Sequence, residues 1–355
     1  MTATNRKVLW AAFLLLLIFS MQNLPFQKTV QIPSLDTKKV VTLSALEQHL
    51  VEIIGGDKFT VTPILGPSEP PFWHEATPDE ITAVSEADIL FIVDLEYLVA
   101  NSTSFDWLGP LLEASDTSGL VQIDLYRNIT MRVDPVLGRI NHLAWTDPRN
   151  VRIMVEDIAN ELGKLDTSNQ AIFKANQVAY QAQLDSLVTD MISQASPYNG
   201  TKVVTASSQS WLFLDLIGFE KVGQIVQDPS GDVTAQEIAE IEEIIFEEDV
   251  NWLIFDWPGP KSFAPAAIET VIQDTGIKSV DFESDVYPTT SYLEIIEDNV
   301  ERIVGAIEGS SEKDSKDISG FDWNISLFSA IMIAMLVISQ TRKRRFNKSQ
   351  TKLYE

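Results

Sequence analysis

The chain has 355 residues, of which 45% are hydrophobic and 22% charged, with a net charge of −25 and no cysteine. This composition is typical of a globular protein, and the lack of cysteine excludes disulfides, thiolate metal sites, cysteine nucleophiles and a lipid anchor on cysteine. A chain this acidic repels nucleic acid, so we expect no nucleic-acid partner.

Residues 1–26 carry a targeting signal. Arg6 and Lys7 precede an apolar run over residues 8–19, whose length is typical of the hydrophobic part of a signal peptide and short for a membrane span. No clear cleavage motif follows this run. We therefore expect a signal peptide, with an uncleaved signal anchor as the alternative.

An N-terminal lobe is expected over residues 27–165. Short apolar runs predict strands, and a helix with one apolar face and a Gly55-Gly56 stop follows the first of them. Near-continuous apolar runs are typical of parallel strands that are covered on both faces. The predicted strands lie within residues 39–43, 59–65, 87–94 and 120–125. His49 lies beside the apolar face of the helix, and we interpret it as an ordinary, partly buried histidine.

A long connecting helix is expected within residues 166–196. Apolar and aromatic residues recur on a helical spacing from Asn169 to Ala195, and a helix of this length would measure about 40 Å at 1.5 Å per residue. Asp166, Thr167 and Ser168 are candidate caps at its start.

The pattern of strands and helices resumes in a C-terminal lobe over residues 197–308. Strands are predicted within residues 202–207, 223–228, 251–257 and 278–284, with an amphipathic helix over 234–248. The sequence therefore predicts an α/β fold of two lobes joined by one long backbone helix. The cleft between two such lobes is the natural place for a ligand.

The last part of the chain predicts a membrane tether. A polar, flexible stalk over residues 309–322 precedes a transmembrane helix over 323–340, and a basic tail over 341–355 follows it. The positive-inside rule places this tail in the cytoplasm and everything before the helix outside the cell membrane. We therefore expect an extracellular protein anchored through its C-terminal helix.

Several segments resemble the solute-binding receptors of zinc and manganese ABC transporters. "VEIIGGDKFTVTPIL" is similar to the family's Gly-Gly-Asp segment, and "HEATPDEITAVSEADILFIVDLEYL" to its Glu-Pro-Thr-Pro helix start and following strand. "AWTDPRNV" resembles its Trp-Leu-Asp-Pro motif, "LDTSNQAIFKANQVAYQAQLDSL" the start of its connecting helix, and "VVTASSQSWLFLDLIGFE" its C-lobe segment. The resemblance covers residues 40–285 in the right order. It implies two lobes, a divalent metal ion as the ligand, and an ABC permease with its ATPase as partners.

The departures from the family fall on its metal ligands. Phe72 stands at the first His position, with His74 two residues later, and Leu143 stands at the second, with His142 one residue before it. Residues i and i+2 of an extended segment face the same side, whereas a slip of one residue reverses the facing. His74 is therefore the better placed of the two histidines.

The C-lobe positions depart as well. Ser207 occupies the third His position, and Asp256 and Asp281 are the candidates for the acidic ligand. The resemblance thus implies a metal site of four residues, His74, His142, Asp256 and Asp281. Such a set suits zinc, and its carboxylates also favour harder ions such as manganese. No organic cofactor is expected.

Other interpretations of these residues remain open. His74 could line a loop beside Trp73, His142 could pack against Trp145, and the two aspartates could be turn residues. Aromatic side chains near the expected cleft would suit an organic or cationic ligand, or could simply pack between the lobes. They are Phe72, Trp73, Trp145, Trp211, Trp252 and Trp257.

Motifs for an enzyme are lacking. The sequence contains no HExxH, no Gly-rich phosphate loop and no nucleophile elbow. We predict a membrane-tethered receptor of an ABC importer that captures zinc or manganese between its lobes. The alternative is the same fold with an eroded metal site, acting as a receptor for another small ligand or as a surface interaction module.

Overall fold

A computed structural model describes most of the two predicted lobes. The described residues are 37–66, 74–94, 107–227, 232–255, 264–284 and 290–309. The predicted signal segment, transmembrane helix and basic tail lie outside these ranges, as does Asp256. Among the described residues, no helix combines the length and apolar character needed to cross a bilayer. The chain divides into units Met1–Thr37 and Lys38–Glu355, and every element below belongs to the second.

Four parallel strands form the sheet of the N-terminal lobe, in the order β2-β1-β3-β4. All four residues of β3 are buried because helices cover the sheet, which explains the continuous apolar run in the sequence. The strands are β1 (Lys38–Thr42), β2 (Phe59–Pro63), β3 (Ile89–Ile92) and β4 (Val121–Asp124); the helices are α2 (Ala45–Gly55), α3 (Pro78–Ser85) and α5 (Leu108–Ala114), with the 3-10 turn η1 (Gly56–Lys58).

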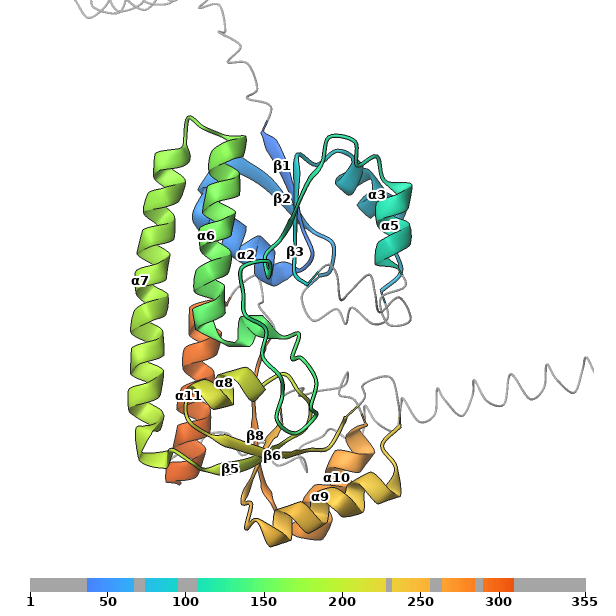
Figure 1. The fold of residues 1–355 in the computed structure, drawn as a ribbon, viewed down its shortest axis with the longest axis vertical. Helices are drawn as coiled ribbons and strands as arrows, with labels where there is room; N and C mark the ends of the chain where they lie inside the picture. Colours follow the sequence, from blue (N-terminus) through green and yellow to red (C-terminus); the bar gives the residue numbers. More distant parts are fainter. Residues whose placement is uncertain are drawn as a thin grey trace, which may run out of the picture. The chain divides into compact units, whose positions relative to one another are not determined.

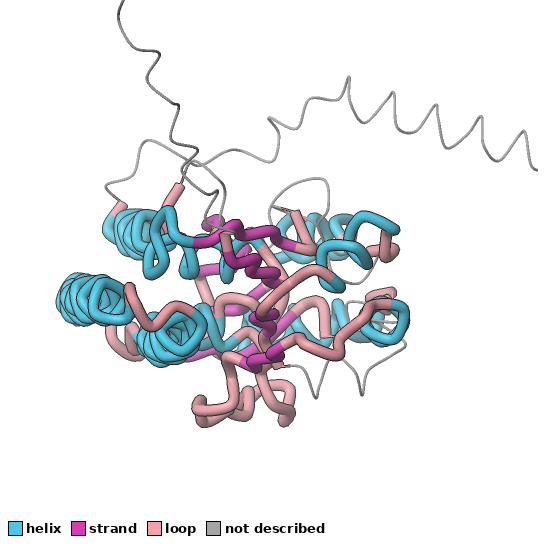
Figure 2. Tube along the Cα trace, turned by 90° about the horizontal axis from the view of Figure 1, so that it is seen from above, coloured by secondary structure: helices cyan, strands magenta, loops and turns pink. Residues whose placement is uncertain are grey.

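The C-terminal lobe repeats this topology in the order β6-β5-β7-β8, again with parallel strands. Helices lie beside the strands of each sheet (Figure 2). The strands are β5 (Lys202–Thr205), β6 (Glu220–Gln224), β7 (Trp252–Phe255) and β8 (Lys278–Asp281); the helices are α8 (Trp211–Leu216), α9 (Ala235–Glu247), α10 (Pro265–Thr275) and α11 (Tyr292–Glu308). The prediction of two α/β lobes is confirmed.

One predicted strand is misplaced. The sequence pattern favours residues 223–228, whereas β6 spans Glu220–Gln224. The strand begins with Glu220 and Lys221, which do not fit an apolar pattern. Lys221 is nevertheless buried, because a carboxylate from a distant segment pairs with it, as described below.

One long helix, α7 (Gln170–Ala195), connects the lobes, and a second long helix packs beside it on α2 of the N-terminal lobe. Helix α6 (Pro148–Leu165) packs along α7, which lies where the sequence predicts the long helix, and α11 also packs against α7 (Figure 1). Asp166 shapes the turn between α6 and α7, since its side chain accepts hydrogen bonds from the backbone N–H groups of Ser168 and Asn169. The short turns η3 (Ala144–Thr146) and η4 (Ser196–Tyr198) precede α6 and follow α7.

The hydrophobic core is shared between the lobes. One cluster of buried residues runs from the N-terminal sheet through α6, α7 and α11 to α8 of the C-terminal lobe. A second, smaller cluster lies between the C-terminal sheet and helices α9 and α10. The shared cluster makes the side of the molecule at α6, α7 and α11 a continuous packed body, from which the two sheets extend.

Candidate functional site

The strand order of each sheet indicates where a ligand would bind. In an open parallel sheet, ligands bind beyond the carboxyl ends of the strands, where the strand order reverses. This position lies between β1 and β3 in one lobe and between β5 and β7 in the other. Asp94 follows β3 and Ser207 follows β5. Asp256, which follows β7, lies outside the described residues.

His142 is hydrogen-bonded to Asp94 at the N-lobe position. Its Nδ1 contacts Asp94 Oδ2, and both side chains are partly exposed, His142 by 26% and Asp94 by 17%. Asp94 has a φ of 52°, in the left-handed region, and its backbone N–H donates to Asp124 Oδ1 over 3.0 Å. In a neutral imidazole, a carboxylate partner favours the proton on Nδ1 and therefore the lone pair on Nε2. Metal-binding histidines commonly have this arrangement, in which a carboxylate orients the ring.

His74 has different surroundings. Its side chain is 4% exposed, and its Nε2 lies 3.0 Å from Glu80 Oε2. The ring packs edge-on against Trp107 with 4.5 Å between the ring centroids. Glu80 also accepts the backbone N–H of Thr77, within the capping box of α3. These contacts favour a structural role for His74 in holding its loop on α3.

Asp281 ends β8, and its backbone carbonyl accepts a hydrogen bond from Arg302 Nη1 over 3.3 Å. Within the described ranges, no three side chains of His, Cys, Asp or Glu are arranged to hold a metal ion. His74, His142 and Asp281 are therefore not gathered at one point. The four-residue metal site stays a prediction, since Asp256 is not described.

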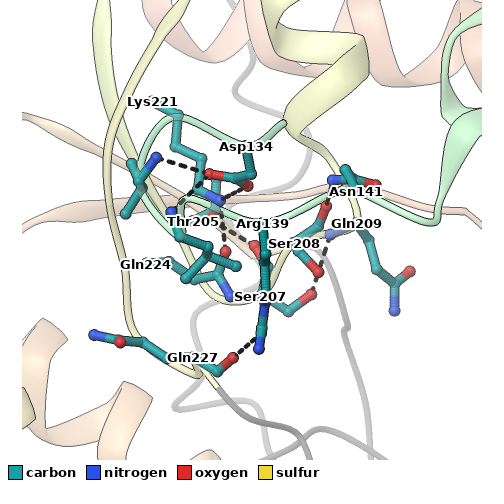
Figure 3. Close-up of polar contacts among 12 residues, drawn as sticks. Asp134, Arg139, Asn141, Thr205, Ser207, Ser208, Gln209, Lys221, Gln224 and Gln227 are labelled. Carbon is teal, nitrogen blue, oxygen red and sulfur yellow. Dashed lines mark hydrogen bonds and ion pairs between the residues drawn. The ribbon is translucent and has the colours of Figure 1, made fainter. Parts of the chain in front are cut away.

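Hydrogen bonds connect the loops at the strand ends. Asn141, next to His142, donates from Nδ2 to the Ser208 carbonyl over 2.9 Å, as Figure 3 shows. Ser284, which follows β8, donates to Gln209 Oε1. Asp94, Asn141, Gln209 and Ser284 were not predicted as site residues. Asp94 and Ser284 are the last residues of predicted strands, so the strand-end rule could have selected them.

Two of the tryptophans belong to packing contacts. Trp211 is 3% exposed, and the Arg132 guanidinium lies 5.1 Å from its ring centroid. Trp252 begins β7 and so lies at the amino end of the sheet, where Lys278 covers its ring at 5.3 Å. The placement of Trp252 near the cleft was therefore wrong, because the residue lies at the opposite end of its strand. Phe72, Trp73 and Trp257 are outside the described residues.

The sequence matches the ZnuA family, described as the periplasmic component A of the zinc-uptake complex, over residues 40–306. The chain belongs to this family. Its members are solute-binding receptors, so the prediction that the protein is not an enzyme is confirmed.

Curated relatives of this ZnuA-family chain cover most of its length. It is 25% identical over 281 residues to the manganese-binding lipoprotein MntA of Halalkalibacterium halodurans, which covers 76% of this chain and 88% of that protein. It is 23% identical over 270 residues to the iron-binding protein YfeA of Yersinia pestis, covering 75% and 85% respectively. The relatives are thus named for different metals.

Solved structures share the fold. The solute-binding protein FpvC of Pseudomonas aeruginosa, solved with Ni²⁺, has a TM-score of 0.64 at 18% identity, covering 78% of this chain and 99% of that one. A crystal structure of ZnuA has a TM-score of 0.63 at 20% identity, covering 76% and 99%. At this level of identity the likeness supports the two-lobe architecture.

Proposed function

We propose that this ZnuA-family receptor captures a divalent metal ion, zinc or manganese, at the carboxyl ends of its strands. It would pass the ion to an ABC permease driven by an ATPase. The observation that carries the proposal is the His142–Asp94 pair, which lies at the N-lobe position where the strand order reverses. The family match supplies the class of function.

The orientation of His142 supports a role as a metal ligand. A neutral imidazole binds a metal through its lone-pair nitrogen, which is Nε2 when Nδ1 donates to Asp94. Asp94 would then fix the orientation of the ring. The partial exposure of both side chains leaves the pair within reach of solvent.

The remaining ligands would come mainly from oxygen atoms. The chain has three histidines; His49 Nε2 accepts from the backbone N–H of Tyr292, and His74 Nε2 contacts Glu80. Asp256 and Asp281 stay the predicted carboxylate ligands, whereas the contacts of His74 with Glu80 and Trp107 favour a structural role over its predicted role as a ligand. A site with one imidazole and several oxygens favours manganese over zinc.

The membrane tether is a further part of the proposal and rests on the sequence. The apolar stretch over residues 325–339 would cross the membrane, with the basic residues after it in the cytoplasm, and would anchor the receptor at the outer face of the membrane. A tether raises the effective concentration of the receptor at its permease. It would replace the lipid named in lipoprotein relatives such as MntA, which a chain without cysteine cannot carry.

The alternative is a receptor for another small ligand, or an interaction module, on the same fold. The lack of a three-residue metal cluster among the described side chains is the observation that favours it. The two functions differ in their need for His142. Metal capture requires its side chain, whereas an interaction module does not.

A thermal-unfolding series on the full-length, chelator-treated protein tests the proposal. Zn²⁺, Mn²⁺, Fe²⁺, Ca²⁺ and Mg²⁺ are added to the wild type and to the His142→Ala, Asp94→Asn and His74→Gln variants. A metal at 100 times its Kd stabilises the native state by about 2.7 kcal/mol. We expect one transition metal to raise the midpoint in the wild type and not in His142→Ala. If no metal shifts the wild type, metal capture is wrong and the alternative function stands.

A further inference from the structure

The segment between β4 and α6 projects as a hairpin, here named the arm (residues 126–143). Val133 and Ile140 pair as an antiparallel bridge, and the Asp134 N–H donates to the Arg139 carbonyl over 2.8 Å. The Asp134 carboxylate closes the tip, since Oδ1 accepts the backbone N–H groups of Val136 and Leu137 over 2.9 and 3.1 Å. Asp134 therefore organises the tip of the arm through one of its oxygens.

The second oxygen of Asp134 pairs with the C-terminal lobe. Its Oδ2 lies 2.6 Å from Lys221 Nζ in β6, and the two side chains are 1% and 0% exposed (Figure 3). Lys221 also donates to Gln224 Oε1 over 2.5 Å. A buried ammonium or carboxylate is unfavourable unless it is paired and hydrogen-bonded. Separation of the arm from β6 would remove the carboxylate partner of the buried Lys221 ammonium.

Three more residues of the arm contact the same lobe. Arg132 pairs with Asp215 of α8 over 2.5 Å and covers the ring of Trp211. Arg139 donates to the Gln227 carbonyl, and Asn141 donates to the Ser208 carbonyl. The arm is thus bound to the C-terminal lobe from Arg132 to Asn141, on both sides of the buried ion pair.

The arm ends at His142, the candidate metal-binding residue. Asn141, the residue before His142, is hydrogen-bonded to Ser208 in the loop after β5. The His142 ring is hydrogen-bonded to Asp94, which follows β3. We propose that Asp134 and Lys221 are positioning residues that lock the arm onto the C-terminal lobe. The lock holds His142 at a fixed distance from the loop after β5, with or without a bound ion. The role given to His142 rests on the proposed function, whereas the lock itself does not.

The distance between the lobes tests the lock. The chain has no cysteine, so spin labels attach only to cysteines that are introduced. Glu113→Cys in α5 and Glu243→Cys in α9 introduce one exposed cysteine in each lobe. In the metal-free, full-length protein we expect one narrow distance distribution. Lys221→Met should broaden it, whereas Val271→Ala, which loosens the core beneath α9 and α10 without touching the arm, should not. A broad distribution in the wild type, or an unchanged one in folded Lys221→Met, overturns the proposal.

A double variant covers the case in which Lys221→Met does not fold. Asp134→Leu with Lys221→Met leaves no buried charge, and such replacements often preserve a fold. We expect the double variant to fold with a broadened distance distribution. If it folds and keeps the narrow distribution, the ion pair does not lock the arm.

The effect on His142 is read by imidazole NMR and by calorimetry. With three histidines in the chain, we expect the double variant to shift the ring signals of His142 and to leave those of His49 and His74 in place. Its affinity for the metal that binds the wild type should fall at least tenfold. Unchanged His142 signals and affinity would overturn the positioning role. If the wild type binds neither Zn²⁺ nor Mn²⁺, metal capture fails, while the label distances and ring signals still decide the lock.

Discussion

His74 and Glu80 join the loop before α3 to the first turn of that helix, with Nε2 of the imidazole 3.0 Å from Oε2 of the carboxylate. The same Glu80 oxygen accepts the Thr77 N–H over 2.9 Å. The imidazole thus extends a capping box, in which Thr77 and Glu80 satisfy backbone groups at the helix start. His74 and His142, which look alike in the sequence, are therefore held by different kinds of contact.

The first prediction separates these two histidines. His74→Ala removes a buried hydrogen bond and the contact with Trp107, so we expect unfolding free energy to fall by about 1–3 kcal/mol. Metal affinity measured by calorimetry should change less than threefold. His142→Ala should show the reverse, with little loss of stability and a large loss of affinity. Equal losses of affinity in both variants would instead confirm His74 as a ligand.

The fold could be predicted from the sequence because its strands and helices are encoded locally. Apolar runs identify β1, β3 and β7, and the helical spacing between Asn169 and Ala195 identifies α7. Strand β6 was misplaced because the charge of the buried Lys221 is compensated by Asp134, 87 residues away in the chain. One sequence does not reveal a pair so distant.

The site could be predicted only in part for the same reason. The order of the motifs indicates that His142 lies near the strand ends, but its partner Asp94 is 48 residues away. The facing rule for extended segments favoured His74 over His142. That rule takes no account of Glu80, whose hydrogen bond to His74 determines where the ring points.

The second prediction concerns pH and His49. Burial lowers the pKa of His49 below its usual value of about 6.5, and the nearby carboxylates of Glu52 and Glu294 oppose this shift only in part. The unfolded chain therefore binds a proton more readily than the native state. The contribution of His49 to the free energy of unfolding is therefore fully present above about pH 6.5 and is lost as the pH falls below that value.

A matched variant isolates this effect from the other titrating groups. His49→Gln keeps an acceptor for the Tyr292 N–H and does not titrate. Urea unfolding at pH 7.5 and 5.0 should show a larger loss of stability on acidification in the wild type than in the variant. Equal losses in the two proteins would contradict the assignment to His49.

The third prediction concerns Glu47, the buried glutamate at the start of α2. Burial raises its pKa, although hydrogen bonds from Ser44 oppose the shift. A carboxyl group whose pKa is raised by folding destabilises the native state increasingly as the pH rises above its usual pKa. Glu47→Gln keeps a capping acceptor for Ser44. We expect the variant to be more stable than the wild type at pH 7.5, with the difference shrinking toward pH 4; a constant difference would count against this cause.

The fourth prediction tests a close approach at Gly218. Its φ is +84°, and a Cβ there would lie 2.2 Å from Asn199 Oδ1. Gly218→Ala should therefore reduce unfolding free energy by about 1–3 kcal/mol. Gly119 is the control, because a Cβ there meets nothing within 4 Å and its φ is not in the left-handed region. Gly119→Ala should be neutral or stabilise by about 0.4–1 kcal/mol, as measured by chemical unfolding.

Four helices begin with the same device, a hydroxyl cap followed three residues later by a glutamate. The glutamates are Glu47, Glu80, Glu237 and Glu294. Each lies at a helix N-terminus, where the partial positive charge of the backbone favours an acidic side chain. In a chain with a net charge of −25, Glu80, Glu237 and Glu294 therefore carry negative charge where it is well tolerated, whereas Glu47 is buried and its pKa is raised. Substitutions intended to make the protein less acidic should therefore leave Glu80, Glu237 and Glu294 unchanged and place new lysines on the exposed helix faces.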